Sequence, residues 1–218
     1  MINNATPEKP GRMAWFVFRS LARYLVSLFI PTFRFFGETN IKSSGHIFIE
    51  KNYGFQSWAY PLTIFKRPIR FIIADTNCDT QWYNTVSDGG LFPIMLSGKF
   101  ESDFELIKQS ISNNENIVLI ISQDEQNIFS NQIIQALKKD YINKISFMAL
   151  SSGAKKVFAN NTIIPKNVNV TMVCGMPFVS TNKVDNNTFE EFHILEASAE
   201  SATEVTDPYF LAYYKNKP

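Results

Sequence analysis

Residues 117–121 read Ile117-Val118-Leu119-Ile120-Ile121, an unbroken apolar run. Such a run is typical of a strand that is buried on both faces of a sheet. Similar short runs predict strands at 47–50, 69–74, 91–96, 145–150 and 168–174. Polar, helix-compatible segments alternate with them at 56–65, 80–86, 102–112, 131–141 and 188–201. This alternation predicts an α/β fold.

The bulk composition limits the classes of function. A chain of 218 residues can form one domain with a substantial core. Its net charge of +1 argues against a nucleic-acid partner. Cys78 and Cys174 give neither a disulfide framework nor metal-ligand spacing, and the spacing of Asp75, Asp79 and Asp88 matches no calcium loop. We therefore expect no metal and no cofactor.

The N-terminal region is apolar but interrupted by arginines. No apolar run between Met13 and Phe36 is long enough to span a bilayer. On a helix, Arg12, Arg19 and Arg23 fall on one side, because their spacings are seven and four. The sequence therefore predicts an interfacial amphipathic helix that ends near Pro31, followed by a short second helical piece at 32–37.

This region, residues 1–40, is expected to dock on a membrane or a partner, with the α/β domain at 41–218. Arginines beside an apolar face suit lipid phosphates next to an acyl boundary. The alternative is an ordinary helix that packs on the domain core.

A second informative stretch reads Gly54-Phe55-Gln56-Ser57-Trp58-Ala59-Tyr60-Pro61, after the predicted strand at 47–50. It resembles the first block of the glycerolipid (lysophosphatidate, PlsC-like) acyltransferases, whose pattern is Asn-His-x-Ser-x-x-Asp-Pro. Ser57 and Pro61 fit that block. Phe55 replaces its histidine and Tyr60 replaces its aspartate.

The two replacements bear on catalysis. The resemblance implies that the family's histidine is a general base for a lipid hydroxyl and that its aspartate orients the histidine. Phe55 cannot titrate, and Tyr60 is neutral near pH 7. Loss of such an acid–base group costs about 100- to 10,000-fold in rate.

The other family blocks are degraded as well. In place of Phe-Pro-Glu-Gly-Thr-Arg, the chain continues Ser122-Gln123-Asp124-Glu125-Gln126, with Gln123 at the glutamate. Near the second block, Lys99 is the nearest cation and no arginine follows Gly89-Gly90. The cations considered as lipid- or phosphate-binding candidates are Arg12, Arg19, Arg23, Arg70 and Lys99.

The resemblance implies a central mixed sheet flanked by helices, with an N-terminal amphipathic helix pair. The sequence favours a catalytically inactive acyltransferase-like protein that acts as a structural or lipid-binding subunit of a membrane complex. Its expected partners are phospholipid and membrane proteins, at a mitochondrial inner or a bacterial cytoplasmic membrane. The alternative is an active 1-acylglycerol-3-phosphate-type acyltransferase that uses acyl-CoA or acyl-carrier protein with substitute catalytic groups.

Overall fold

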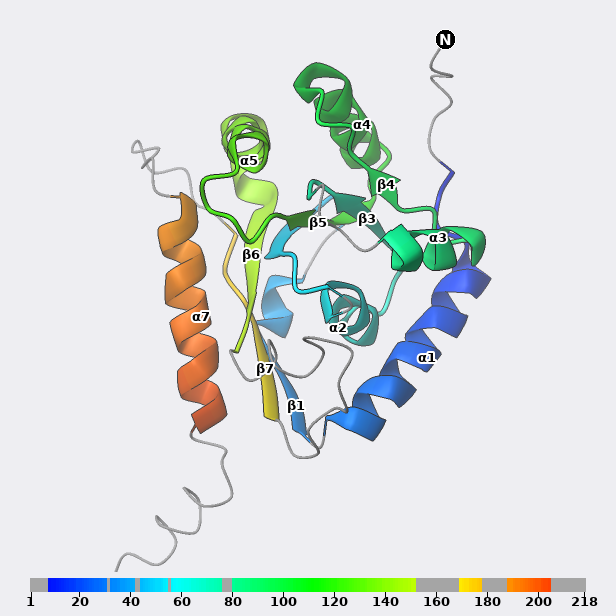
Figure 1. The fold of residues 1–218 in the computed structure, drawn as a ribbon, viewed down its shortest axis with the longest axis vertical. Coiled ribbons are helices and arrows are strands. Elements are labelled where there is room, and N and C mark those ends of the chain that lie inside the picture. Colours follow the sequence, from blue (N-terminus) through cyan, green and yellow to red (C-terminus); the bar gives the residue numbers. More distant parts are fainter. Residues whose placement is uncertain are drawn as a thin grey trace, which may run out of the picture.

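The structure is a computed structural model that describes residues 8–30, 32–41, 44–54, 56–75, 80–151, 169–177 and 188–204. Its helices and strands are labelled in chain order in Figure 1. They are α1 Arg12–Phe29, β1 Thr32–Phe36, the 3-10 turn Glu38–Asn40, β2 Ile47–Lys51, α2 Gln56–Ile64, β3 Ile69–Ile73, α3 Thr80–Asp88, β4 Ile94–Met95, α4 Phe100–Ser112, β5 Asn116–Ile121, α5 Ile128–Tyr141, the 3-10 turn Ile142–Lys144, β6 Ile145–Leu150, β7 Asn169–Cys174 and α7 Thr188–Glu204.

The strands form one mixed sheet in the order β1-β7-β6-β2-β5-β3-β4. All neighbours are parallel except β6 and β7, which are antiparallel. The run at 117–121 lies in β5 between β2 and β3, and its five side chains are fully buried. The predicted α/β fold with a central mixed sheet is confirmed.

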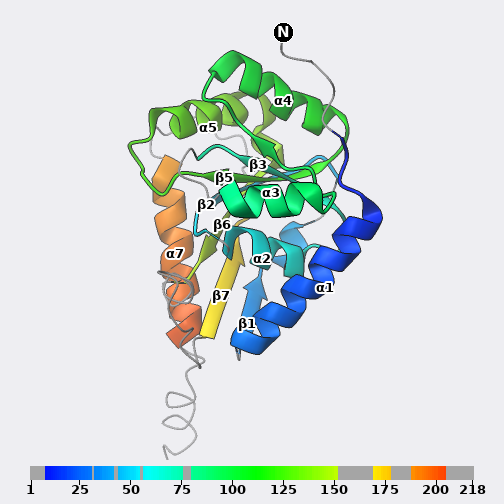
Figure 2. The ribbon, with the colours of Figure 1, turned by 45° about the vertical axis from the view of Figure 1, so that its right-hand side comes forward.

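Helices cover both faces of the sheet. Side chains of α1 and α2, among them Trp15, Val26 and Trp58, join one apolar core. Side chains of α4, α5 and α7 join the other, where Ile107 and Phe192 are fully buried. Figure 2 shows α1 and α2 on one side of the strands and α5 and α7 on the other. Successive residues of β5 point alternately into the two cores, which is why its sequence is apolar without interruption.

The predicted second helical piece at 32–37 is wrong. Residues Thr32–Phe36 form strand β1, which pairs in parallel with β7 from Thr32↔Asn169 to Phe36↔Val173. The segment Thr-Phe-Arg-Phe-Phe is rich in aromatic and β-branched side chains, which suit a pleated surface better than a helix. Pro31 comes between α1 and this strand in the sequence. The arginine-bearing helix is therefore followed by a strand and not by a second helix.

Candidate functional site

The degraded motif lies where β2 ends and α2 begins, at the carboxyl ends of the parallel strands. Ser57 is fully buried and holds this turn together. Its Oγ accepts a 2.8 Å hydrogen bond from the Tyr53 backbone N–H and donates a 3.1 Å bond to the Lys51 carbonyl. Phe55 lies outside the described residues. Ser57 is therefore a structural link, with its single proton already donated to the backbone.

Loops that follow three neighbouring strands, β2, β5 and β3, meet at this end of the sheet. The side-chain amide of Gln123, beyond β5, donates a hydrogen bond to the Asn52 carbonyl, beyond β2. The Asn52 side chain donates in turn to Asp75, beyond β3, at 2.8 Å. Ligands of open α/β sheets bind at this end. The structure thus brings Ser57 and Gln123 together around Asn52, although the sequence placed them in separate blocks.

Tyr60, which the resemblance matches to the family's aspartate, lies inside the core. It is fully buried, and its hydroxyl has no hydrogen-bond partner among the described residues. Its ring stacks on Phe33 of β1, with ring centroids 5.0 Å apart. Burial, and next the nearby Glu50 carboxyl, raise the pKa of Tyr60. The side chain is neutral and serves packing.

Glu50 is a buried carboxyl that the sequence analysis did not single out. It is fully buried, and neither carboxylate oxygen has a partner in the described part of the chain. Burial raises the pKa of Glu50 well above its ordinary value. This environment favours the neutral, protonated form of the carboxyl group. The signal in the sequence was the acidic residue that ends the apolar run Ile47-Phe48-Ile49.

A charged network on the other face of β2 was also missed. The buried Lys51 ammonium lies 3.2 Å from Glu125 and 3.4 Å from Glu196, under the rings of Phe189 and Phe192. The Tyr53 hydroxyl donates a 2.8 Å hydrogen bond to Glu196.

The exposed His193 adds a third contact from α7 to this network. Its ring nitrogens lie 3.1 Å from Glu125 and 3.6 Å from Glu196. Together these contacts join β2, α7 and the loop after β5. No local sequence signal could reveal them, because α7 lies far from β2 along the chain.

The candidate phosphate-binding cations do not gather at the motif. Arg12 and Arg23 are exposed on α1, and Arg19 is half-buried there. Arg70, at the start of β3, is buried and bound to Glu115. Lys99 is exposed before α4, where its backbone N–H donates to Asp103. Among the residues that the structure describes, no group of histidine, cysteine and acidic side chains could hold a metal ion.

The outer face of α1 is apolar. The core-facing side carries Trp15, Ala22 and Val26, which are buried. The opposite side carries large apolar or aromatic side chains that are about half or more exposed, namely Met13, Phe16, Val17, Leu21, Tyr24 and Leu28. These residues are called the outer face of α1 below. None of the described helices has the length and hydropathy needed to span a bilayer.

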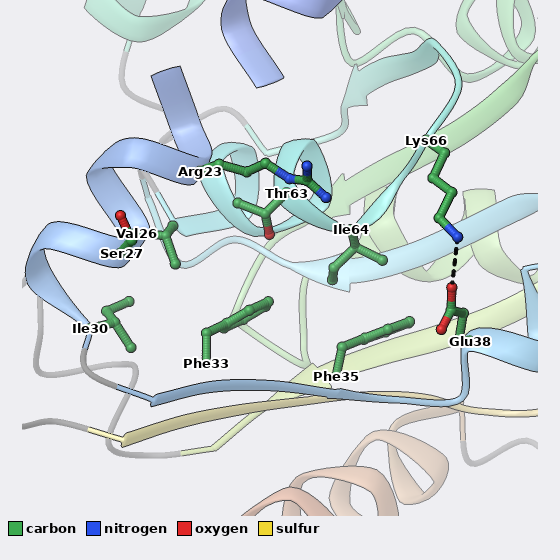
Figure 3. Close-up of a pocket in the computed structure, with 10 residues that line it drawn as sticks. All are labelled: Arg23, Val26, Ser27, Ile30, Phe33, Phe35, Glu38, Thr63, Ile64 and Lys66. Carbon is green, nitrogen blue, oxygen red and sulfur yellow. Dashed lines mark hydrogen bonds and ion pairs between the residues drawn. The ribbon is translucent and has the colours of Figure 1, made fainter. Parts of the chain in front are cut away.

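A groove of about 470 Å³ lies between α1, β1 and α2. Figure 3 shows Phe33 and Phe35 pointing from β1 toward the two helices, with Arg23 reaching over Thr63. An ion pair of 3.2 Å between Lys66 and Glu38 closes one end. The groove therefore combines apolar walls with a charged rim.

Comparisons with known proteins agree with this architecture. No family model and no curated protein matches the sequence. Among solved structures, the 1-acyl-sn-glycerophosphate (LPA) acyltransferase PlsC from Thermotoga maritima is similar, with a TM-score of 0.54 and 12% sequence identity over 89% of this chain and 80% of that chain. The chain therefore has a PlsC-like acyltransferase fold.

Proposed function

We propose that this chain is a catalytically inactive acyltransferase-fold protein that docks on a membrane surface through α1 and binds lipid. The observation that carries the proposal is the outer face of α1, where Met13, Phe16 and Leu28 are 77%, 65% and 59% exposed. Water-exposed apolar side chains in one stripe are unfavourable unless another apolar phase covers them. Arg12 and Arg23 flank that stripe, as in helices that lie in the plane of a lipid interface.

The inactive part of the proposal rests on the motif positions. Tyr60 is buried and neutral where the family has a charged partner for its base. Gln123 binds the Asn52 carbonyl where the family has a glutamate. Neither residue can take a proton from a lipid hydroxyl near pH 7. The groove beside Arg23 offers apolar walls for an acyl chain, in the size range of ligand pockets.

Vesicle flotation combined with an acyl-transfer assay tests this proposal. The natural chain should float with phospholipid vesicles and should not convert lysophosphatidate and long-chain acyl-CoA above the rate without protein. Phe16→Gln with Leu28→Gln should weaken vesicle binding by about tenfold or more, because each removes a side chain that enters the lipid. Ile128→Gln, on the exposed side of α5 at the other face of the sheet, is the matched control.

We also propose that the chain belongs to a protein complex in a mitochondrial inner or bacterial cytoplasmic membrane. The apolar core is intact on both faces of the sheet, whereas the stretches that resemble the family's reactive motifs are degraded. This combination supports a protein that is retained for its surfaces. Extraction in mild detergent followed by sedimentation should give a particle heavier than the chain alone. Sedimentation as a single chain in a lipid micelle would contradict complex membership and leave the docking proposal intact.

The second candidate is an active acyltransferase that uses acyl-CoA or acyl-carrier protein. The buried Glu50, close enough to Tyr60 to raise its pKa, is the observation that favours it. The natural chain would then convert lysophosphatidate, and Glu50→Gln would abolish this turnover while the protein stays folded. That result would establish the alternative and refute the proposal of an inactive protein.

A further inference from the structure

A second cavity, of about 630 Å³, opens at the amino ends of the parallel strands, away from the motif. Four segments that are distant in sequence line it: the start of α1 with the residues before it, the connection between β1 and β2 at Glu38, Ile41 and Ser44, the turn between α2 and β3, and the turn between α4 and β5. It is called the amino-end pocket below. Because β2, β3 and β5 run in parallel, this pocket and the motif lie at opposite ends of the same strands.

The amino-end pocket carries an excess of positive charge. Its lining includes five cationic side chains, Lys9, Arg12, Lys66, Arg67 and Arg70, against the two carboxylates Glu38 and Glu115. Each carboxylate is already paired, Glu38 with Lys66 at 3.2 Å and Glu115 with Arg70 at 2.8 Å.

Three of the five cationic side chains therefore have no carboxylate partner among the described residues. Lys9, Arg12 and Arg67 are exposed, and no ion pair joins any of them to another residue in the described ranges. These three cations are available to an anion that enters the pocket.

Amide groups complete the lining. Asn113, Asn114 and Asn116 border the pocket from the turn before β5. The Oδ1 of Asn116 accepts a 3.1 Å hydrogen bond from the His46 backbone, so its other amide atom is the NH₂ donor. Asn114 adopts a left-handed backbone, with φ of 63°, which asparagine tolerates better than most residues. Asparagine amides and arginine guanidinium groups are common donors to phosphate oxygens.

Arg70 holds the pocket in shape. Its guanidinium donates to both carboxylate oxygens of Glu115, at 2.8 and 3.2 Å. It also donates to the backbone carbonyls of Glu8 and Phe92, at 2.6 and 2.7 Å. The chain that carries Lys9 is thereby fixed beside the turn before β5. Lys9, Arg12 and Arg67, which form no ion pair with the described residues, thus surround a preformed cavity, which lowers the ordering needed when a ligand binds.

We propose that the amino-end pocket binds the phosphorylated headgroup of an anionic lipid. A headgroup with more than one negative charge matches three cations that have no ion pair among the described residues, beside asparagine side chains that border the same pocket. Lipid is the favoured source because Arg12 belongs to the pocket and is followed directly by Met13 of the outer face of α1. A helix that lies in the interface would bring the pocket to headgroup level. This inference rests on the proposed membrane docking.

Flotation with three kinds of vesicle tests the inference. One is phosphatidylcholine alone, one adds phosphatidylinositol bisphosphate, and one adds phosphatidylserine to the same total charge. The natural chain should bind the phosphoinositide vesicles most tightly. Lys9→Gln with Arg67→Gln should reduce that affinity about 25-fold, at about fivefold for each basic residue near an anionic surface. The control Lys139→Gln, an exposed lysine on α5, should change it little.

The outcomes separate the two proposals. Equal binding to the two charge-matched vesicles, or an equal effect of the control variant, would overturn the headgroup site while docking through α1 could still hold. Loss of phosphatidylcholine binding in Phe16→Gln with Leu28→Gln, with the preference for phosphoinositide retained, would support both.

Calorimetry with inorganic pyrophosphate tests whether the pocket binds a soluble phosphate compound. The natural chain should bind pyrophosphate, and the Lys9→Gln, Arg67→Gln variant should not. Together with the preference for phosphoinositide vesicles, this result would support a site that recognises phosphate groups. Pyrophosphate binding without any binding to vesicles would overturn lipid as the source and identify the ligand as a soluble phosphorylated molecule.

Discussion

The ring of Tyr60 lies almost parallel to the ring of Phe33, at 10° between their planes and 5.0 Å between their centroids. This contact joins α2 to the edge strand β1, with Tyr60 buried in the core and Phe33 half-buried against it. The position that the resemblance matches to the family's aspartate is therefore a packing position in this chain. Restoring the family's residue would place a carboxylate among aromatic rings.

Tyr60→Asp should destabilise the fold by about 3–5 kcal/mol, because it removes a buried aromatic ring and leaves a polar group without a partner. Tyr60→Phe should be neutral or slightly stabilising, because it removes only the unpartnered hydroxyl. Chemical denaturation of both variants measures this. A stable Tyr60→Asp protein would show that the position is open to solvent.

Glu50 should make stability depend on pH. Its pKa in the folded state is raised above the ordinary value of 4.5, so the folded state holds the proton more tightly than the unfolded state. Its contribution is complete below pH 4.5 and is lost as pH rises toward the raised pKa, by about 1.4 kcal/mol per pH unit. Glu50→Gln should remove this loss and be more stable than the natural chain near pH 7. An unchanged pH profile in the variant would show that the carboxyl is solvated.

His46 should act in the opposite direction. Burial, and then Lys144, lower the pKa of this histidine to about 4, so the folded state holds the neutral ring. Its contribution is complete above pH 6.5 and is lost as pH falls from 6.5 toward 4. His46→Gln should flatten the acid limb of the stability profile, which unfolding at stepped pH would measure. The Glu50→Gln protein is the comparison, since it should keep that limb.

Lys51 should anchor α7 to the sheet. Lys51→Met keeps the length of the side chain but leaves Glu196, which is 15% exposed, without its cation. We expect a loss of about 3–5 kcal/mol, as for other buried pairs that lose one partner. Adding Glu196→Gln to Lys51→Met should cost less than the sum of the single changes, because the two groups interact. Strict additivity in this double-mutant cycle would show that the pair contributes nothing.

Several parts of the architecture could be predicted from the sequence. The buried strands β5 and β6 carry apolar runs whose pattern is local, and the predicted bounds 145–150 match β6. The helix at 12–29 could also be predicted, because arginines at spacings of seven and four mark one side of it. The segment at 32–37 was assigned incorrectly because five residues between Pro31 and Gly37 carry little periodicity. Its strand conformation depends on pairing with β7, far along the chain.

The candidate site likewise has features that the sequence alone shows and features that only the tertiary structure shows. The sequence alone shows Phe55 and Tyr60 at the two positions that the resemblance matches to the family's histidine and aspartate. Only the tertiary structure decided that Tyr60 faces Phe33, that Lys51 meets Glu196, and that Lys9 and Arg67 share a pocket. Side-chain periodicity is a property of neighbouring residues, whereas these contacts arise when distant segments pack on a common sheet.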